Sequence, residues 1–357
     1  MEIASLLALS VSKHASDLHL LPNSAPLMRI DGMLAPIKEH PLIPAEENKK
    51  LIYSIMTPEQ QRIFETNRVF EMPLSLPNIG NFRVSILHQL HGIAAVFRVI
   101  PEKIPGFEEL SLPAILKSLL GLTHGLILVT GPTGSGKSTT LAAMIDYINT
   151  FMACNIITIE DPIEFIYQNK KSVFHQLQIG RDTPDFATAL RASLRQDPNV
   201  ILLSELRDLE TMRLALTAAE TGHLVMATLH ATSAPTAISR FADVFPSEEK
   251  NRVRNLLAET LQAVVCQTLV KKISGGRTAA FEIMLMTPAI RHFIRQDMAA
   301  HMESAMQTSG SKGMCTLEQY LRELVAKRII SSVTADTAIA NRGVFKEAND
   351  ASLKINK

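Results

Sequence analysis

The chain has 357 residues, of which 46% are hydrophobic, and its formal net charge at pH 7 is +1. This length and composition predict two folded domains, and the near-neutral charge excludes a general attraction to nucleic acid or anionic lipid. The three cysteines are too few and too scattered for a disulfide framework or a CxxC metal site, which is typical of a reducing cytosol. No apolar stretch approaches the length of a membrane-spanning helix, so we expect a soluble cytoplasmic protein.

Residues 1–100 predict a small α+β domain. The opening segment MEIASLLALSVSKHASD has only a short apolar run, so it predicts an amphipathic helix rather than an export signal. The strand DLHLL and the hairpin PLMRIDGMLAPI follow, with Asp31 and Gly32 at the turn because such turns need positive φ angles. Helical periodicity covers about Pro44 to Thr66, and the alternating segments NFRVSILHQL and GIAAVFRVI predict further strands of a sheet.

The rest of the chain has a different pattern. Proline and glycine concentrate in residues 101–113 (PEKIPGFEELSLP), which predicts a linker or hinge. In residues 114–342 the apolar runs GLILVTG, NIITIED, NVILLSE and HLVMATLH alternate with helical segments, which indicates a parallel sheet buried on both faces. From about Pro246 we expect mostly helix. Residues 343–357 form a polar tail that we expect to be mobile.

The segment GLILVTGPTGSGKSTT contains a G-x-x-x-x-G-K-[ST] pattern between an apolar strand and a helical segment. In this pattern backbone N–H groups surround the phosphates, the lysine reaches the β- and γ-phosphates, and the hydroxyl after it binds Mg²⁺. The strand–loop–helix context is the required one, so the sequence predicts an ATP site. The expected nucleotide-binding residues of the loop are Gly131, Pro132, Thr133, Gly134, Ser135, Gly136, Lys137, Ser138 and Thr139.

Two acidic clusters follow apolar strands, at the positions where ligands bind in α/β sheets. The segment TIEDPIEF supplies Glu160, Asp161 and Glu164, and ILLSELRD supplies Glu205 and Asp208. Hydrolysis needs acids that place Mg²⁺ and the attacking water. A single acid at a strand end is more often a helix cap or a surface charge, but two clusters in one P-loop domain favour the catalytic interpretation.

Two histidines flank the apolar run LVMATL, with His223 before it and His230 after it. A lone histidine is more often structural. Because His230 ends a further strand of the same sheet, it is a candidate contact to the γ-phosphate.

Several motifs together closely resemble, in content and in order, the PilT family of type IV pilus retraction ATPases within the secretion-ATPase superfamily. They are ASDLHL, RIDG, GPTGSGKSTTLAAM, TIEDPIEF, LRQDP, ELRDLETMRLALTAAETGHLVMATLHATSA and AIRHFIRQ. The resemblance implies a RecA-like P-loop ATPase domain with a helical C-terminal part, joined flexibly to a smaller PAS-like N-terminal α+β domain. It also implies ATP and Mg²⁺ as cofactors and a homohexameric ring.

The partners that this resemblance implies are an inner-membrane platform protein of the pilus and, only indirectly, pilin. The expected location is therefore the cytoplasmic face of the inner membrane, and no nucleic acid is expected as a partner. Nucleotide contacts made from two domains differ before and after hydrolysis, so residues 101–113 could transmit a rigid-body motion around the ring.

The resemblance also implies roles for the acids. TIEDPIEF corresponds to the Asp box of the family, with Glu164 as the glutamate that activates water and with Glu160 and Asp161 beside the nucleotide. ILLSELRD corresponds to the Walker B region, in which Glu205 is catalytic and holds Mg²⁺ together with Ser138.

The resemblance also implies roles for two histidines and two arginines. TGHLVMATLH corresponds to the His box, with His230 in the catalytic set and His223 beside the nucleotide. The two FR pairs of the N-terminal domain place Arg83 and Arg98 where the family uses arginines that approach the nucleotide across the domain cleft.

The segment AIRHFIRQ corresponds to a family motif, AIRNLIRE, that favours retraction over extension. It comprises Ala289, Ile290, Arg291, His292, Phe293, Ile294, Arg295 and Gln296. Arg291 and Arg295 match the motif, whereas His292, Phe293 and Gln296 depart from it. On the residues alone, the apolar side chains (Ala289, Ile290, Phe293 and Ile294) share one helical face and the arginines form an i,i+4 pair, so the bare pattern favours a core-packed helix with a solvated charged face.

Other functions remain open on the sequence. A type IVB or type II secretion ATPase or a pilus-extension ATPase would share the same core, although extension enzymes usually carry a longer N-terminal region and a tetracysteine zinc motif. A type IVB secretion ATPase of similar size is the nearest alternative. A RecA-like helicase is a second alternative. Ser204 stands where the family usually has glycine, which predicts slower turnover and leaves a non-hydrolysing, nucleotide-gated scaffold as a third.

Overall fold

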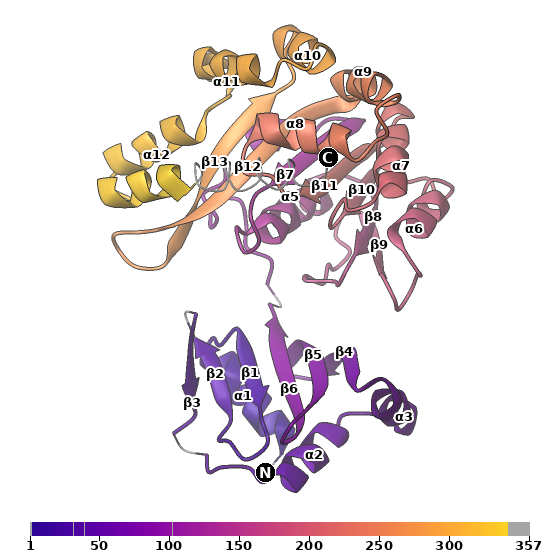
Figure 1. Cartoon of the computed structure of the whole chain (residues 1–357), viewed down its shortest axis with the longest axis vertical. Coiled ribbons are helices and arrows are strands. Elements are labelled where there is room, and N and C mark those ends of the chain that lie inside the picture. Colours follow the sequence, from indigo (N-terminus) through magenta and orange to yellow (C-terminus); the bar gives the residue numbers. More distant parts are fainter. Residues whose placement is uncertain (1, 31, 39, 102, 342–357) are drawn as a thin grey trace. The chain divides into compact units, whose positions relative to one another are not determined.

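The computed structural model describes residues 2–30, 32–38, 40–101 and 103–341 (Figure 1). The chain divides into two compact units, Met1–Lys103 and Ile104–Lys357. Phe107 is buried in a core of the second unit, so part of the predicted linker belongs to that unit. The predicted tail and Asp31 of the predicted hairpin turn lie outside the described residues. Within the described ranges, no helix has the length and apolar character needed to cross a bilayer.

The first unit combines an antiparallel sheet with helices. Its elements are α1 (Ile3–Ser12), β1 (Asp17–Leu20), β2 (Leu27–Ile30), β3 (Met33–Pro36), α2 (Ala45–Tyr53), α3 (Pro58–Asn67), β4 (Val69–Leu76), β5 (Gly80–Gln89) and β6 (Gly92–Ile100). The strand order is β3-β2-β1-β6-β5-β4, and every pairing is antiparallel. The helices pack on the sheet through one core that includes Leu6, Ile52 and Phe64. The predicted α+β domain and its first helix are therefore present.

The single stretch of helical periodicity predicted for residues 44–66 is two helices. Thr57 starts α3 with a capping box, in which its hydroxyl accepts from the backbone of Gln60 and the Gln60 side chain accepts from the backbone of Thr57. Pro58 then occupies the first helical position, where its missing N–H costs nothing. Hydrophobic periodicity alone does not detect that one helix ends and a second helix begins within this stretch.

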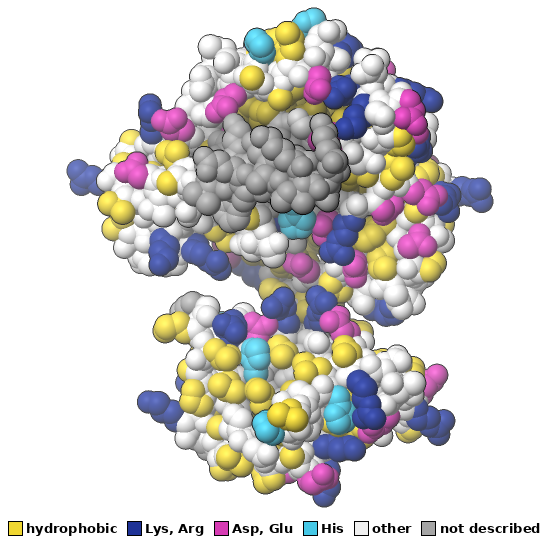
Figure 2. Space-filling view, in the orientation of Figure 1, with side chains coloured by type: hydrophobic (Ala, Val, Ile, Leu, Met, Phe, Trp, Pro, Cys, Tyr) yellow, Lys and Arg dark blue, Asp and Glu magenta, His cyan; other side chains and the backbone are white. Residues whose placement is uncertain are grey.

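Hydrophobic side chains also lie on the surface of the first unit, as Figure 2 shows. Met33 on the edge strand β3 is 76% exposed, and Leu90 in the turn between β5 and β6 is 91% exposed. Exposed apolar side chains on an edge strand are typical of surfaces that contact another chain.

The second unit is built on a mostly parallel sheet. Its elements are α4 (Ile115–Leu119), β7 (Gly125–Thr130), α5 (Lys137–Phe151), β8 (Asn155–Glu160), β9 (Val173–Gln178), α6 (Phe186–Ser193), β10 (Val200–Leu203), α7 (Leu209–Glu220), β11 (Leu224–Leu229), α8 (Ala234–Asp243), α9 (Lys250–Thr260), β12 (Leu261–Lys271), β13 (Arg277–Leu285), α10 (Pro288–Arg295), α11 (Ala299–Thr308), η1 (Gly310–Lys312), α12 (Leu317–Ala326) and a helix of residues 332–341. The strand order is β13-β12-β7-β11-β10-β8-β9, with only β13 antiparallel to its neighbour.

Helices cover both faces of this sheet (Figure 1). One core contains side chains of α4 and α5, and a second contains side chains of α6 to α11. The central strands β7 and β11 are buried at every position, as the predicted parallel sheet requires. The carboxyl ends of β7, β10 and β11 therefore meet at one edge of the sheet, which positions the site described below.

The region after Pro246 differs from its prediction, because β12 and β13 form a long hairpin between the helices. β12 pairs with β7 on one side and with β13 on the other, so it is a central strand. A strand in that position has a continuous apolar run, which periodicity does not separate from a buried helix. The sequence signal that could have predicted this hairpin is the pair Gly275 and Gly276. Both residues adopt positive φ in the hairpin turn.

Candidate nucleotide-binding site

The predicted phosphate loop connects β7 to α5 at the carboxyl edge of the sheet. β7 ends at Thr130 and α5 begins at Lys137, so the loop leads into a helix N-terminus, where backbone N–H groups bind anions. Gly136 adopts φ +86°, a conformation that side chains rarely adopt. A Cβ at Gly131 would lie 2.3 Å from the backbone oxygen of Gln267 on β12. Neither glycine position has room for a side chain without distortion.

The ammonium group of Lys137 lies at the mouth of this loop. Its Nζ donates hydrogen bonds to the carbonyls of Gly131 and Pro132, each at 3.0 Å. Burial lowers the pKa of Lys137, and the charges of Glu205 and Glu164 oppose this effect. The lysine is therefore electrostatically coupled to one acid from each predicted acidic cluster.

The side chains around the loop fit a magnesium nucleotide. The buried hydroxyls of Thr130 and Ser135 have no hydrogen-bond partner among the described residues, so they can serve a ligand. Ser138 lies half-buried in the first turn of α5, and its hydroxyl and the carboxylate of Glu205 are oxygen ligands of the kind that Mg²⁺ prefers. The described residues hold no group of three or more His, Cys, Asp or Glu side chains placed for a metal.

Glu205 follows β10 and contacts two cationic or ionisable side chains. One carboxylate oxygen lies 3.0 Å from Nε2 of His230, and the other accepts from Arg207 at 2.8 Å. Arg207 also lies 3.6 Å from Asp161, and its hydrogen bond to Glu205 raises its pKa. Arg207 thus bridges the two acidic clusters. The sequence analysis missed it, although a cation two residues after Glu205 was a visible signal.

Ser204, the departure from the family pattern, makes a specific contact. Its hydroxyl accepts a hydrogen bond from the backbone N–H of Asp161 at 3.1 Å, and its carbonyl accepts from the hydroxyl of Thr228. The serine side chain therefore joins the segments that carry Glu164 and Glu205.

The other acids of the two clusters have different surroundings. Glu160 is only 6% exposed, and its carboxylate accepts from Thr158 at 2.7 Å and from Gln176 at 3.3 Å. Burial raises its pKa to about 7. Glu164 is exposed, whereas Asp208 caps the N-terminus of α7. Glu160 thus points into the β8–β9 region, and of the acids in TIEDPIEF only Asp161 and Glu164 are exposed for a ligand.

His230 lies at the carboxyl end of β11, and contacts from α8 and β13 fix the segment after it. The Arg240 guanidinium of α8 donates to the His230 carbonyl at 2.6 Å. Glu282 of β13 accepts from the backbone N–H of Ala234 at 2.7 Å, at the start of α8. These contacts fix the backbone at His230, whose imidazole contacts Glu205.

His223 lies at the amino-terminal end of β11, which is the end of the sheet opposite the phosphate loop. This position corrects the prediction that His223 lies beside the nucleotide. β11 pairs in parallel with β7, from Leu224 opposite Gly125 to Leu229 opposite Thr130. His223 precedes this strand, so it lies roughly 20 Å from the phosphate loop at about 3.3 Å per residue. Its Nδ1 contacts a backbone carbonyl of α7.

Arg83 and Arg98 face each other on β5 and β6 of the first unit. Arg83 pairs with Glu71 and Arg98 pairs with Asp17, each at 2.9 Å. The carboxylate side chain of Asp17 is 5% exposed, which makes it a fixed anchor for Arg98. The two predicted arginines are therefore presented together on one face of the sheet.

The segment AIRHFIRQ forms α10, and the predicted helix is present. Ile290 and Ile294 are buried and Phe293 packs against the same core, whereas Ala289 is exposed and does not belong to the predicted apolar face. The helix has its C-cap at Gln296.

The two arginines of α10 have different surroundings. Arg291 donates hydrogen bonds to the carbonyls of Ala258 and Glu259, the latter at 3.0 Å, at the end of α9. Burial lowers the pKa of Arg291, and the nearby charge of Arg295 acts in the same direction. Arg295, like His292, is exposed. Arg291 therefore serves as a C-terminal cap for α9, whereas Arg295 remains a surface charge.

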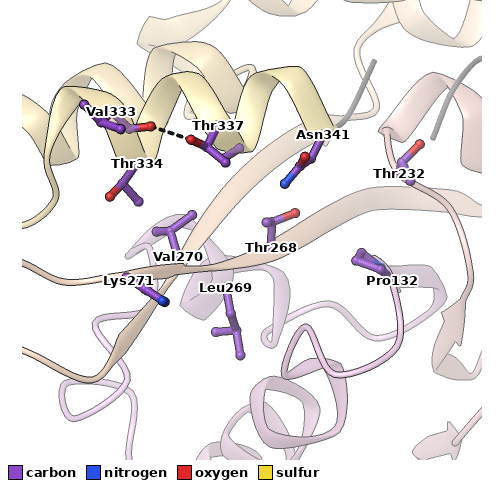
Figure 3. Close-up of a pocket in the computed structure, with 11 residues that line it drawn as sticks. Pro132, Thr232, Thr268, Leu269, Val270, Lys271, Val333, Thr334, Thr337 and Asn341 are labelled. Atoms are coloured by element: carbon purple, nitrogen blue, oxygen red, sulfur yellow. Dashed lines mark hydrogen bonds between the residues drawn. The ribbon is translucent and has the colours of Figure 1, made fainter. Parts of the chain in front are cut away.

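A cavity of about 450 Å³ lies beside the phosphate loop (Figure 3). It is bounded by the end of β12, by the helix of residues 332–341 and by single residues of the phosphate loop and of the segment after β11. The lining residues are Pro132, Thr232, Thr268, Leu269, Val270, Lys271, Val333, Thr334, Thr337, Ala338 and Asn341. The cavity therefore touches the phosphate loop at Pro132.

Comparison with known proteins identifies the family. The family described as type II/IV secretion system protein matches residues 2–343. The "Type IV pilus retractation ATPase PilT" of Pseudomonas aeruginosa is 52% identical over 338 residues, which cover 94% of this chain and 97% of that protein. A crystal structure of the pilus retraction motor PilT with bound ADP has a TM-score of 0.89 at 42% identity, with 95% and 97% of the two chains covered.

An X-ray structure of the Legionella pneumophila ATPase DotB has a TM-score of 0.82 at 27% identity, with 94% of each chain covered. The predicted resemblance to type IV pilus retraction ATPases and the predicted RecA-like α/β fold are therefore confirmed. The chain belongs to the type II/IV secretion system protein family.

Proposed function

We propose that this chain hydrolyses ATP and powers the retraction of type IV pili. The observation that carries the proposal is the convergence of Lys137, Glu205 and His230 at the carboxyl edges of β7, β10 and β11. The 52% identity to a pilus retraction ATPase over nearly the whole chain supports the same function.

In this proposal each side chain has a separate task. Lys137 and the N–H groups of the loop bind the β- and γ-phosphates and offset the charge that develops there. Glu164 orients the attacking water and accepts its proton, because it is exposed beside the site. Ser138 and Glu205 would hold Mg²⁺, which would supply positive charge that offsets the charge developing on the phosphates. His230, which contacts Glu205, would detect the γ-phosphate.

We further propose that the working form is a homohexameric ring. Arg83 and Arg98 are presented together on the first unit, as required of arginines that reach a nucleotide from another domain. The exposed apolar residues Met33 and Leu90 supply surface for contacts between copies. The partner of the ring would be a pilus platform protein at the inner membrane.

Phosphate release by the purified chain tests the enzymatic part of this proposal. We expect ATP-dependent, magnesium-dependent release, together with a hexamer-sized species in light scattering. A purified, folded chain that binds ATP without releasing phosphate would support the nucleotide-gated scaffold instead.

A secretion ATPase of the DotB type is the second candidate, since that structure matches 94% of the chain. The identities of 42% to PilT and 27% to DotB among solved structures favour pilus retraction. The neighbouring genes decide between them: pilus genes support the first candidate and secretion-system genes the second.

A further inference from the structure

Gln267 lies on β12, outside every motif that the sequence analysis identified, and is only 2% exposed. β12 pairs with β7 as far as Thr130 and then continues alongside the phosphate loop. Figure 3 shows Thr268 and Leu269 on opposite sides of this extension, with Leu269 pointing away from the helix of residues 332–341. Because side chains alternate along a strand, Gln267 shares the side of Leu269.

Both ends of the Gln267 amide are hydrogen-bonded to the nucleotide-binding segment. Its Nε2 donates to the carbonyl of Ser135 at 2.8 Å, and its Oε1 accepts from the hydroxyl of Thr140 at 2.7 Å. Ser135 belongs to the loop and Thr140 to the first turn of α5. One buried amide therefore spans residues 136–139, which include the lysine and the serine of the motif.

The glycines of the loop also pack against Gln267. A Cβ at Gly131 would lie 2.3 Å from its backbone oxygen, and a Cβ at Gly136 would lie 2.9 Å from its Nε2. At both positions the atom nearest to such a Cβ belongs to Gln267.

The hydrogen bond to Ser135 fixes the direction of an N–H group. The carbonyl of Ser135 and the N–H of Gly136 belong to one planar trans peptide, so they point in opposite directions. With the carbonyl held toward Gln267, the N–H of Gly136 is directed away from β12, to the other side of the loop. N–H groups at this part of the loop are the ones that bind phosphate oxygens.

We propose that Gln267 is a positioning residue for phosphate binding, which acts by holding the peptide between Ser135 and Gly136 and the first turn of α5. This inference rests on the proposed ATP site, and it concerns binding rather than the chemical step. Through Gln267, β12 therefore contributes to the affinity for nucleotide.

The same helix provides a matched control. Asn149, in the last turn of α5, is fully buried, donates to the carbonyl of Gln168 at 2.8 Å and accepts from the backbone of Lys170 at 3.0 Å. It is thus a buried amide with a donor and an acceptor contact at the other end of α5 from the phosphate loop. Loss of either amide should lower stability, but only Gln267 should affect phosphate binding.

The test is calorimetric titration of the full chain with ADP, which requires no hydrolysis. Gln267→Met keeps the volume of the side chain and removes both hydrogen bonds, and we expect it to weaken ADP binding at least about ten-fold. Thr140→Val removes one of the bonds without touching Gln267 and should weaken binding less. The double variant should be no weaker than Gln267→Met alone, since the two groups act through one contact.

Asn149→Leu should lower the thermal midpoint as much as Gln267→Met does, while ADP affinity stays within about two-fold of wild type. Binding of ADP by Gln267→Met with wild-type affinity would overturn the inference. So would equal loss of affinity in Gln267→Met and Asn149→Leu, because the amide would then be merely structural. A wild-type chain that binds ADP but hydrolyses no ATP would defeat the proposed function alone, and the comparison of the variants would still decide the role of Gln267.

Discussion

The carboxyl edge of the sheet in the second unit and the helix α10 both carry charged side chains that the sequence marks as functional. At the sheet edge, Lys137 and Glu205 lie close enough to interact electrostatically, and Arg207, which the sequence did not mark, joins Glu205 to Asp161. In α10, Arg291 caps a neighbouring helix, and Arg295 is exposed. Charged residues that lie together at the ends of several strands therefore indicate a ligand site, whereas two charged residues at helical spacing on one helix can have unrelated roles.

The largest effect is expected at the phosphate loop. Lys137→Ala removes the charge that meets the β- and γ-phosphates, so we expect hydrolysis to fall below detection and nucleotide affinity to fall roughly 100-fold or more. Phosphate release and calorimetric titration measure the two effects. Lys170→Ala, which loses a 2.7 Å ion pair to Asp146 instead, is the matched control and should leave both unchanged. Normal turnover by Lys137→Ala would contradict the claim that the charges at the sheet edge form a ligand site, in contrast to those of α10.

The acids at the sheet edge should separate binding from hydrolysis. Glu164→Gln and Glu205→Gln each keep the shape of the side chain but remove its charge and basicity, so we expect nucleotide to bind while hydrolysis falls by roughly 100-fold to 10,000-fold. Glu210→Gln, which loses only a surface pair with Arg191, is the control. An acid whose amide variant turns over at the normal rate has no catalytic role.

Glu160 belongs to the same end of the sheet as Glu164 and Glu205, but its carboxylate is buried. Its pKa is raised from 4.5 to about 7 by burial, so the folded protein binds a proton that the unfolded chain releases between these values. Stability must therefore fall as pH rises through this window, by about 3 kcal/mol relative to Glu160→Gln. Urea unfolding followed by circular dichroism at a series of pH values measures the difference. Parallel stability curves for the two proteins would show that Glu160 is not buried as a proton-binding group.

The two arginines of α10 should differ in stability. Arg291→Ala leaves the carbonyls of Ala258 and Glu259 without their donor, so we expect a loss of about 1–2 kcal/mol in unfolding free energy. Arg295→Ala should change stability by about 0.5 kcal/mol or less, because its side chain is exposed. Thermal and urea unfolding of the purified variants checks both values, and equal losses would contradict the separation of roles.

Arg295→Ala is consequently the cleaner test of an output role for α10. We expect its ATP hydrolysis to remain within a few fold of wild type while pilus retraction in cells is lost. Parallel loss of hydrolysis and retraction would instead place Arg295 in assembly of the active ring.

The sequence was sufficient for the phosphate loop, because its pattern depends on local backbone geometry between a strand and a helix. It was also sufficient for the parallel sheet, since the buried strands are continuous apolar runs. It was also sufficient to place His230 at the carboxyl end of its strand, whereas only the family resemblance placed His223, which precedes the same strand, beside the nucleotide. The contacts of Gln267 and the helix-capping role of Arg291 were beyond its reach, because their partners are distant in sequence and become neighbours only through tertiary packing.

The most direct test of the account is to follow pili in living cells that lack this gene and carry a copy of it on a plasmid. We expect cells without the gene to accumulate surface pili that do not retract. The wild-type copy should restore retraction, and the Glu205→Gln copy, produced at the same level, should not. Normal retraction in the deletion strain, or restoration of retraction by Glu205→Gln, would contradict the claim that ATP hydrolysis at this sheet edge drives retraction.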